Sequence, residues 1–173
     1  MLRILTYTVT AAFAALILPS AALAGELFGG VYGHNVNTPL TIGSPESGMD
    51  VQLGYRWRAI GKTGLQPYAF GALNTAGDTC YAAAGLSYKF GDKIFIRPGV
   101  GIAVHNGSAD DFNRTDRIAF GSRVLFEPEL GIGARISQRM TLEASWVHMS
   151  HAQLFGQQNP GIDNIGARLT LGL

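Results

Sequence analysis

The chain has 173 residues, with 13 lysines and arginines against 12 aspartates and glutamates, and Cys80 is its only cysteine. The balanced charge gives no indication of nucleic-acid binding, and a lone cysteine excludes an internal disulfide and a cysteine-based structural zinc site. After residue 24 there is no run of about 20 apolar residues, which excludes a helical membrane protein.

The first 24 residues have the layout of a secretory signal peptide. Arg3 is their only charge, an apolar stretch occupies 11–18, and Ala22-Leu23-Ala24 forms a small-x-small cleavage pattern. A retained membrane anchor is the alternative, but the apolar core is short and is interrupted by threonine and proline. We therefore predict a signal peptide over 1–24 and one mature domain over 25–173.

Alternation of apolar and polar residues is the strongest structural signal in the mature chain. Every even-numbered position of 124–136 is apolar, whereas the positions between are mostly glutamate, glycine and arginine. The stretches 51–58, 94–104 and 164–173 have a similar pattern. Successive side chains of a strand point to opposite faces, so each stretch is predicted to be a strand with one apolar and one polar face.

Eight strands are expected, near 26–34, 49–58, 65–74, 80–90, 93–105, 119–136, 139–151 and 162–173. The connections after the second, fourth and sixth strands are compact, and the others tend to be longer and polar. Short periplasmic turns and longer outer loops alternate in this way in outer-membrane barrels. The sequence therefore predicts an all-β fold: an eight-stranded antiparallel transmembrane β-barrel with both termini on the periplasmic side.

The polar face suits the cramped interior of a small barrel, and the apolar face would then meet lipid. Eight charged side chains are predicted to pair inside: Arg56, Arg97, Arg123, Glu127, Glu129, Arg135, Glu143 and Arg168. A soluble sandwich or lipocalin-like fold is the alternative, and it would have an apolar interior. A closed barrel is favoured because closure leaves no unpaired backbone edge in hydrocarbon.

Three residues of the last two strands could carry chemistry. His148 and Ser150 lie two apart on the apolar face of the strand 139–151, where polar groups are costly unless they function. Histidine can take the proton of a serine hydroxyl and so make it a nucleophile. Asp163 has the parity of the apolar face of the next strand, so a hairpin would bring it beside His148 to orient the imidazole. The alternative is that His148, His151 and Asp163 are partly hydrated rim residues at the membrane interface.

Two short stretches carry a resemblance to a known family. His148-Met149-Ser150-His151-Ala152 and Asn159-Pro160-Gly161-Ile162-Asp163 resemble the signature of the lipid A 3-O-deacylases, which are eight-stranded outer-membrane barrels. The resemblance implies that His148 is the base, Ser150 the nucleophile and Asp163 the acid. It also implies that Asn159 lies near the oxyanion site.

The chain departs from that signature at two positions. His151 stands where the family has an asparagine that helps to shape the oxyanion hole, so the expected donors are backbone N–H groups around Ala152 and the side chain of Asn159. Asp163 stands where the family often has glutamate, and the loop before it is one residue longer. Since glutamate is usual there, Asp163→Glu is expected to keep substantial activity.

The resulting hypothesis is an outer-membrane esterase that removes an ester-linked acyl chain, the one at position 3, from lipid A of lipopolysaccharide. The partners implied are lipid A and the membrane, with no nucleic acid, metal or cofactor. The oligomeric state is left open between a monomer and a homodimer. The alternative function is a non-enzymatic small barrel for adhesion or membrane stabilisation, which would not need Ser150 or Asp163.

Overall fold

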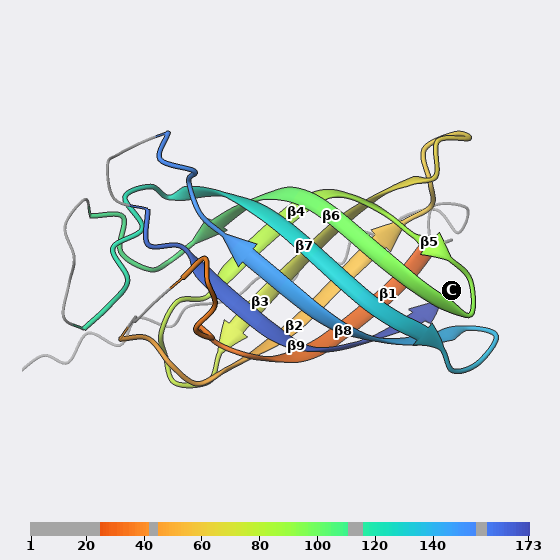
Figure 1. Cartoon of the computed structure of the whole chain (residues 1–173), viewed down its shortest axis with the longest axis horizontal. Helices are drawn as coiled ribbons and strands as arrows, with labels where there is room; N and C mark the ends of the chain where they lie inside the picture. Colours follow the sequence, from red (N-terminus) through yellow and green to blue (C-terminus); the bar gives the residue numbers. More distant parts are fainter. Residues whose placement is uncertain (1–24, 42–44, 111–115, 155–158) are drawn as a thin grey trace, which may run out of the picture.

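The computed structural model describes residues 25–41, 45–110, 116–154 and 159–173, which form a closed antiparallel β-barrel (Figure 1). The strands are β1 (Gly25–Gly33), β2 (Met49–Trp57), β3 (Leu65–Asn74), β4 (Tyr81–Tyr88), β5 (Phe90–Gly91), β6 (Ile94–His105), β7 (Val124–Arg135), β8 (Met140–Met149) and β9 (Ile162–Gly172). Each long strand pairs with its neighbours in sequence, and the pairings β1–β9 and β4–β6 close the ring. The short β5 only extends the turn before β6. The predicted signal peptide, 1–24, lies outside the described residues.

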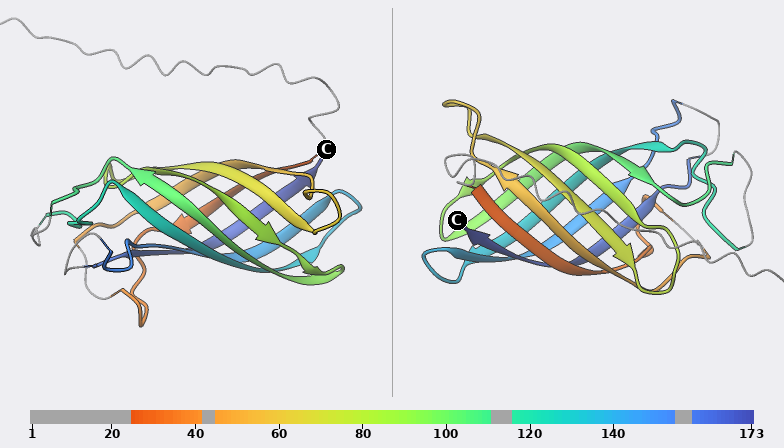
Figure 2. Two further views of the ribbon diagram at one scale, coloured as in Figure 1. Left: turned by 90° about the horizontal axis from the view of Figure 1, so that it is seen from above. Right: turned by 180° about the vertical axis from the view of Figure 1, so that it is seen from behind.

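The start of the first strand and the end of the last strand lie side by side. The amide of Leu173 donates a hydrogen bond to the carbonyl of Gly25 at 2.9 Å, at the end of the barrel that has the short turns (Figures 1 and 2). The connections before β2, β4, β7 and β9 lie at the opposite end, which we call the outer end. Within the described ranges, no helix is long and apolar enough to cross a membrane.

The two faces of the wall have opposite chemistry. Apolar side chains point outward along most of the strands; Val100, Ile102 and Ile132 on β6 and β7 are each more than half exposed. The interior holds aromatic rings and charged groups, among them Phe28, Tyr32, Tyr68 and Phe70. An exposed apolar wall around a charged interior is the arrangement of a membrane barrel and the reverse of a soluble sandwich.

A network of ion pairs fills the middle of the barrel. Arg168 donates to Glu129 at 2.7 Å and to Glu143 at 3.3 Å, and Arg56 and Arg97 both pair with Glu26 near the inner end. Six of the eight charges predicted to lie inside are buried there: Arg56, Arg97, Glu127, Glu129, Glu143 and Arg168. Glu26, which the alternation did not single out, completes the network.

The predictions for Arg123 and Arg135 were wrong. Arg135 has the inward parity but lies at the inner rim, where its side chain is 40% exposed and pairs with Asp92 of the β5–β6 turn. Arg123 donates to the carbonyl of Gly107 at the outer end. The strand expected from 119 begins only at Val124, because the preceding residues turn inward and the Phe120 ring packs in the barrel core.

Glycines on the inner face make room for the charged side chains. A Cβ atom on Gly131 would lie 2.9 Å from Oε2 of Glu143, and one on Gly99 would lie 2.7 Å from Cγ of Glu129. Both distances are shorter than a normal van der Waals contact. The alternation of glycine with glutamate and arginine therefore reflects a barrel too narrow for a large side chain at every inward position.

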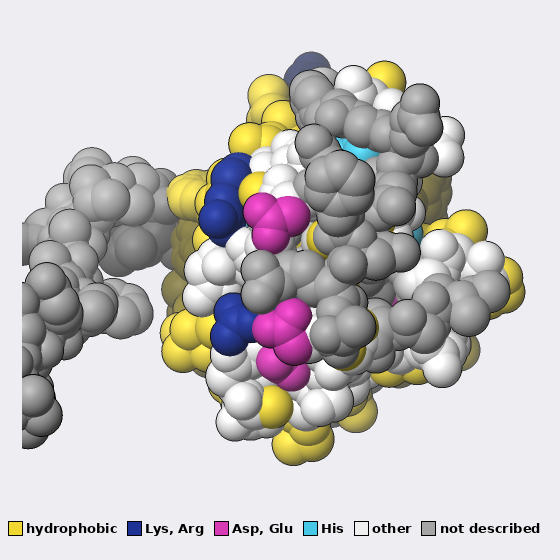
Figure 3. Space-filling model, turned by 90° about the vertical axis from the view of Figure 1, so that its left-hand side faces the viewer, with side chains coloured by type: hydrophobic (Ala, Val, Ile, Leu, Met, Phe, Trp, Pro, Cys, Tyr) yellow, Lys and Arg dark blue, Asp and Glu magenta, His cyan; other side chains and the backbone are white. Residues whose placement is uncertain are grey.

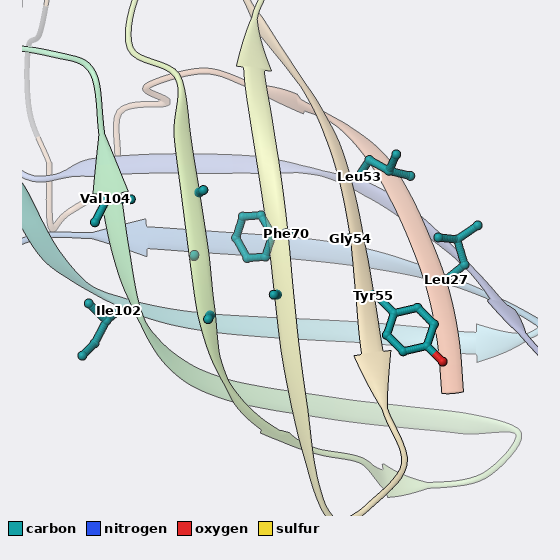
Figure 4. A pocket seen from close by; sticks show the side chains of 11 residues that line it. Leu27, Leu53, Gly54, Tyr55, Phe70, Ile102 and Val104 are labelled. Carbon is teal, nitrogen blue, oxygen red and sulfur yellow. The ribbon is translucent and has the colours of Figure 1, made fainter. Parts of the chain in front are cut away.

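A shallow apolar hollow lies on the outer wall over β1 to β4 and β6 (Figure 4). Leu53, Ile102 and Val104 flank it, and small outward residues such as Ala69 and Ala84 form its floor. In the strand order, β3 lies across the barrel from β8, so this hollow is remote from the residues with predicted chemistry.

Candidate active site

The β8–β9 hairpin brings the predicted residues together at the outer end of the barrel. The two strands pair antiparallel in a register that sets His148 directly opposite Asp163. Ser150 follows β8, and its backbone forms a two-bond bridge with Phe126 of β7. The nucleophile candidate is thus anchored to one neighbouring strand and the acid candidate lies on the other.

The three side chains form a continuous hydrogen-bonded chain. Nδ1 of His148 lies 2.8 Å from Oδ1 of Asp163, and Nε2 lies 3.0 Å from Oγ of Ser150. The carboxylate can only accept, so Nδ1 carries the proton and Nε2 accepts from the serine hydroxyl. This is the tautomer in which histidine can act as a general base toward serine.

The three side chains are largely shielded from solvent, and His148 is the most exposed of them. The side chain of His148 is 12% exposed and that of Asp163 is fully buried, while Ser150 is 8% exposed. The imidazole lies beside the indole of Trp146, with ring centroids 5.9 Å apart. Both rings are on the outward face of β8, so a ligand would reach Ser150 from the lipid side.

Asp163 has three further hydrogen-bond donors that the sequence did not reveal. Nε1 of Trp146 donates to Oδ1 at 2.7 Å, and the hydroxyls of Thr41, at 2.7 Å, and Thr38 both donate to Oδ2. Trp146 could have been anticipated, because it precedes His148 by two residues on the same face. The two threonines come from the loop between β1 and β2, where no periodicity indicates which side chains point to the site.

The predicted oxyanion residues surround the turn after Ser150. Oδ1 of Asn159 accepts the amide of His151 at 3.0 Å, and this bond links the end of β8 to the segment before β9. His151 is fully buried, whereas Ala152 is exposed. Ala152 and Gln153 have φ angles of 52° and 60°, a left-handed conformation that is strained for residues other than glycine and that often marks functional sites.

A second buried polar cluster holds the base of the loop between β1 and β2. His34 donates to Asp50 at 2.9 Å and contacts Glu46 at 3.2 Å, and all three side chains are shielded from solvent. Burial lowers the pKa of His34, but the hydrogen bonds to Asp50 and Glu46 outweigh it and raise the pKa to about 9. Within the described residues, no group of three or more histidine, cysteine, aspartate or glutamate side chains is arranged to hold a metal ion.

Charged side chains lie at the outer end of the barrel. Viewed end-on, Lys, Arg, Asp and Glu side chains gather on one side of this rim, and hydrophobic side chains lie around its periphery (Figure 3). The change from apolar wall to charged rim marks the level at which a bilayer surface would lie. The site residues lie at the outer end of the strands, close to this level.

Comparisons with known proteins agree with this description. The crystal structure of the outer membrane enzyme PagL superposes with a TM-score of 0.60 over 85% of this chain and 99% of that one, at 24% identity. A de novo designed transmembrane β-barrel matches with a TM-score of 0.52 and 13% identity, over 87% of this chain and 96% of that one. No curated protein matches the sequence.

The predicted fold, an eight-stranded antiparallel β-barrel of the outer membrane, is confirmed. A family model for the lipid A 3-O-deacylases, PagL, matches residues 44–171, a range that holds β2 to β8, all of β9 but its last residue, and all the predicted site residues. This match covers well over half of the chain. The chain belongs to the lipid A 3-O-deacylase (PagL) family.

Proposed function

We propose that the protein removes the ester-linked acyl chain at position 3 of lipid A, with Ser150 as nucleophile, His148 as general base and acid, and Asp163 as the group that orients the imidazole. The observation that carries the proposal is the unbroken chain from Ser150 Oγ through both nitrogens of His148 to Asp163. Family membership supplies the substrate class. All three side chains come from one chain, so the proposal needs no second copy.

The reaction runs in two halves. Ser150 Oγ attacks the ester carbonyl carbon while its proton passes to Nε2 of His148, and a tetrahedral intermediate forms. Collapse of the intermediate breaks the bond to the sugar oxygen, which takes the proton back from His148 and leaves as the free hydroxyl. Water then attacks the acyl-enzyme with the same histidine as base, releases the fatty acid and restores Ser150.

Oxyanion stabilisation is assigned to the turn after Ser150. The side-chain oxygen of Asn159, Oδ1, accepts a hydrogen bond from the His151 amide, so Nδ2 of Asn159 is the donor that this side chain can offer to the oxyanion. Ala152, an exposed residue with φ 52°, supplies the second N–H. The amide of His151 itself is less suitable, because it already donates to Asn159.

The placement on the outward face fits a substrate that arrives from the membrane. Leu142 on the same face of β8 is 47% exposed on the outer wall, and Phe126 beside Ser150 is 39% exposed. An acyl chain of lipid A in the outer leaflet could therefore lie along the apolar wall while its ester reaches the rim. A site in the lumen would have required the acyl chain to enter the charged interior of the barrel.

Purified protein and its variants test the assignment on lipopolysaccharide, with the released fatty acid measured over time. Ser150→Ala and His148→Asn should both lose all measurable deacylation, because neither group works without the other. Asp163→Ala should lose about 10²–10⁴-fold, the range seen when a triad acid is removed. Heat-dependent migration on gels confirms that each variant is folded. Full activity in folded Ser150→Ala protein would refute the proposed nucleophile.

A further inference from the structure

The carboxylate of Asp163 is held from both sides. Oδ1 accepts from Trp146 and His148, and Oδ2 accepts from Thr38 and Thr41, so both oxygens have two donors each. A carboxylate offers about four lone-pair positions, and here they are all used. Asp163 is also completely buried, so its hydrogen-bond donors in the structure are protein groups.

Both hydroxyls reach Asp163 from one tight turn in the first outer loop. Thr38 and Thr41 exchange backbone hydrogen bonds with each other, at 3.0 Å and 3.3 Å. The turn is fixed to β9 by the amide of Val36, which donates to the carbonyl of Asp163 at 2.7 Å, and by the amide of Asn35, which donates to Asn164. The loop is thus docked on the acid through main chain and side chains together.

Each threonine hydroxyl is set to donate to the carboxylate. Oγ1 of Thr38 accepts the amide of Leu40 at 3.0 Å, so its single proton is directed to Asp163. Oγ1 of Thr41 lies 2.7 Å from the Asp163 carboxylate but 3.4 Å from the carbonyl of Val36, so the carboxylate is the nearer acceptor. Neither contact depends on a flexible side chain, because β-branched threonine has few rotamers.

We propose that Thr38 and Thr41 are positioning residues for the triad acid: they lock Oδ2 of Asp163 so that Oδ1 stays aligned with Nδ1 of His148. This inference rests on the proposed function. The two hydroxyls do not touch the reacting atoms. They act by preventing rotation of the Asp163 carboxylate about its bond to Cβ.

The same four hydrogen-bond donors around position 163 favour aspartate over glutamate there. Glutamate would add a methylene to a fully buried side chain whose two oxygens each have two donors in place. Asp163→Glu should therefore lose activity, in contrast to the expectation from the sequence. Overpacking of this kind displaces neighbouring groups.

The test replaces the hydroxyls without changing the shape of the side chains. Thr38→Val, Thr41→Val and the double variant should each lower kcat, the double by about 10- to 100-fold, the range for loss of one or two hydrogen bonds to a charged group. KM should change by less than about twofold, because the substrate is not contacted. Serine at either position should restore kcat, since the hydroxyl returns. Thr75→Val, at another outer turn, is the matched control and should keep the parental rate.

A double-mutant cycle separates positioning from structural support. In an Asp163→Asn background the two valine substitutions should cost less than about twofold, because the group they position has lost its charge. Equal losses in both backgrounds would overturn the inference, as would parental kcat in the folded double valine variant. If the double variant does not fold, Thr38→Val alone, which changes a half-buried side chain, is compared in the parent and in the Asp163→Asn background, and the same outcomes apply.

A second readout keeps this inference distinct from the proposed function. The rate at which a fluorophosphonate labels Ser150 reports the activation of the hydroxyl without lipid A. If the parent does not deacylate lipid A but labels rapidly, and the valine variants label slowly, the substrate assignment fails and the positioning role stands. If the parent deacylates lipid A and the valine variants match it in both assays, only the positioning role fails.

Discussion

Removing one partner from the buried ion pairs of the lumen should strongly destabilise the barrel, and Arg168→Met tests this. Arg168 is 1% exposed and donates to Glu129, Glu143 and the hydroxyl of Tyr32. Methionine has a similar volume but no donors, so two buried carboxylates lose a partner at once. Breaking a buried pair on one side costs about 3–5 kcal/mol of unfolding free energy.

Arg135→Met is the matched control, because it removes the same charge from an exposed pair at the inner rim. Exposed pairs contribute about 0–1 kcal/mol. Both variants would be refolded into lipid vesicles and unfolded with urea, with tryptophan fluorescence and heat-dependent gel migration as the two probes. A loss for Arg168→Met no larger than that for Arg135→Met would refute the reasoning that the lumen network holds the barrel together.

Three further predictions follow from the outer loops and the chain start. Asp50 and Glu46 stabilise the charged form of His34 and raise its pKa to about 9, against 6.5 in the unfolded chain. This shift contributes about 3 kcal/mol to the unfolding free energy. The contribution is complete below pH 6.5 and is lost as the pH rises through 9. The urea midpoint of the parent should fall over this range, whereas that of His34→Gln should change much less. Gly161→Ala should lower both stability, by about 1–2 kcal/mol, and the deacylation rate, because φ is +60° and the new Cβ would lie 3.1 Å from Cε1 of His148; an unchanged rate would show that this contact does not matter. Mass spectrometry of the mature protein should give Gly25 as its first residue, and a start inside β1 would contradict the predicted cleavage site.

Much of the fold could be predicted from the sequence because a membrane barrel imposes a strict two-residue period. Lipid selects one face and a narrow lumen selects the other, so the parity of Glu127 and Glu129 on β7 was sufficient to place them inside. Parity gives direction but not depth along the barrel axis. For that reason it placed Arg135 in the central network, although the residue lies at the rim and pairs with Asp92.

The site was predictable where it lies on strands and not where it lies on loops. His148 and Asp163 follow from parity and from pairing of consecutive strands. Thr38 and Thr41 reach the same carboxylate from a loop whose path depends on tertiary packing, and no local pattern marks their direction. The indications in the sequence that the surroundings of the acid differ were the aspartate, where the family often has glutamate, and the longer loop before it.

The most direct test of the account is mass spectrometry of lipid A from cells that produce either the parent protein or Ser150→Ala at equal levels in the outer membrane. The account predicts that the parent converts lipid A to a species lighter by one ester-linked acyl chain at position 3, and that Ser150→Ala leaves lipid A unchanged. The same loss of mass with both proteins would contradict Ser150 as the nucleophile, and unchanged lipid A with both would contradict the proposed deacylase activity.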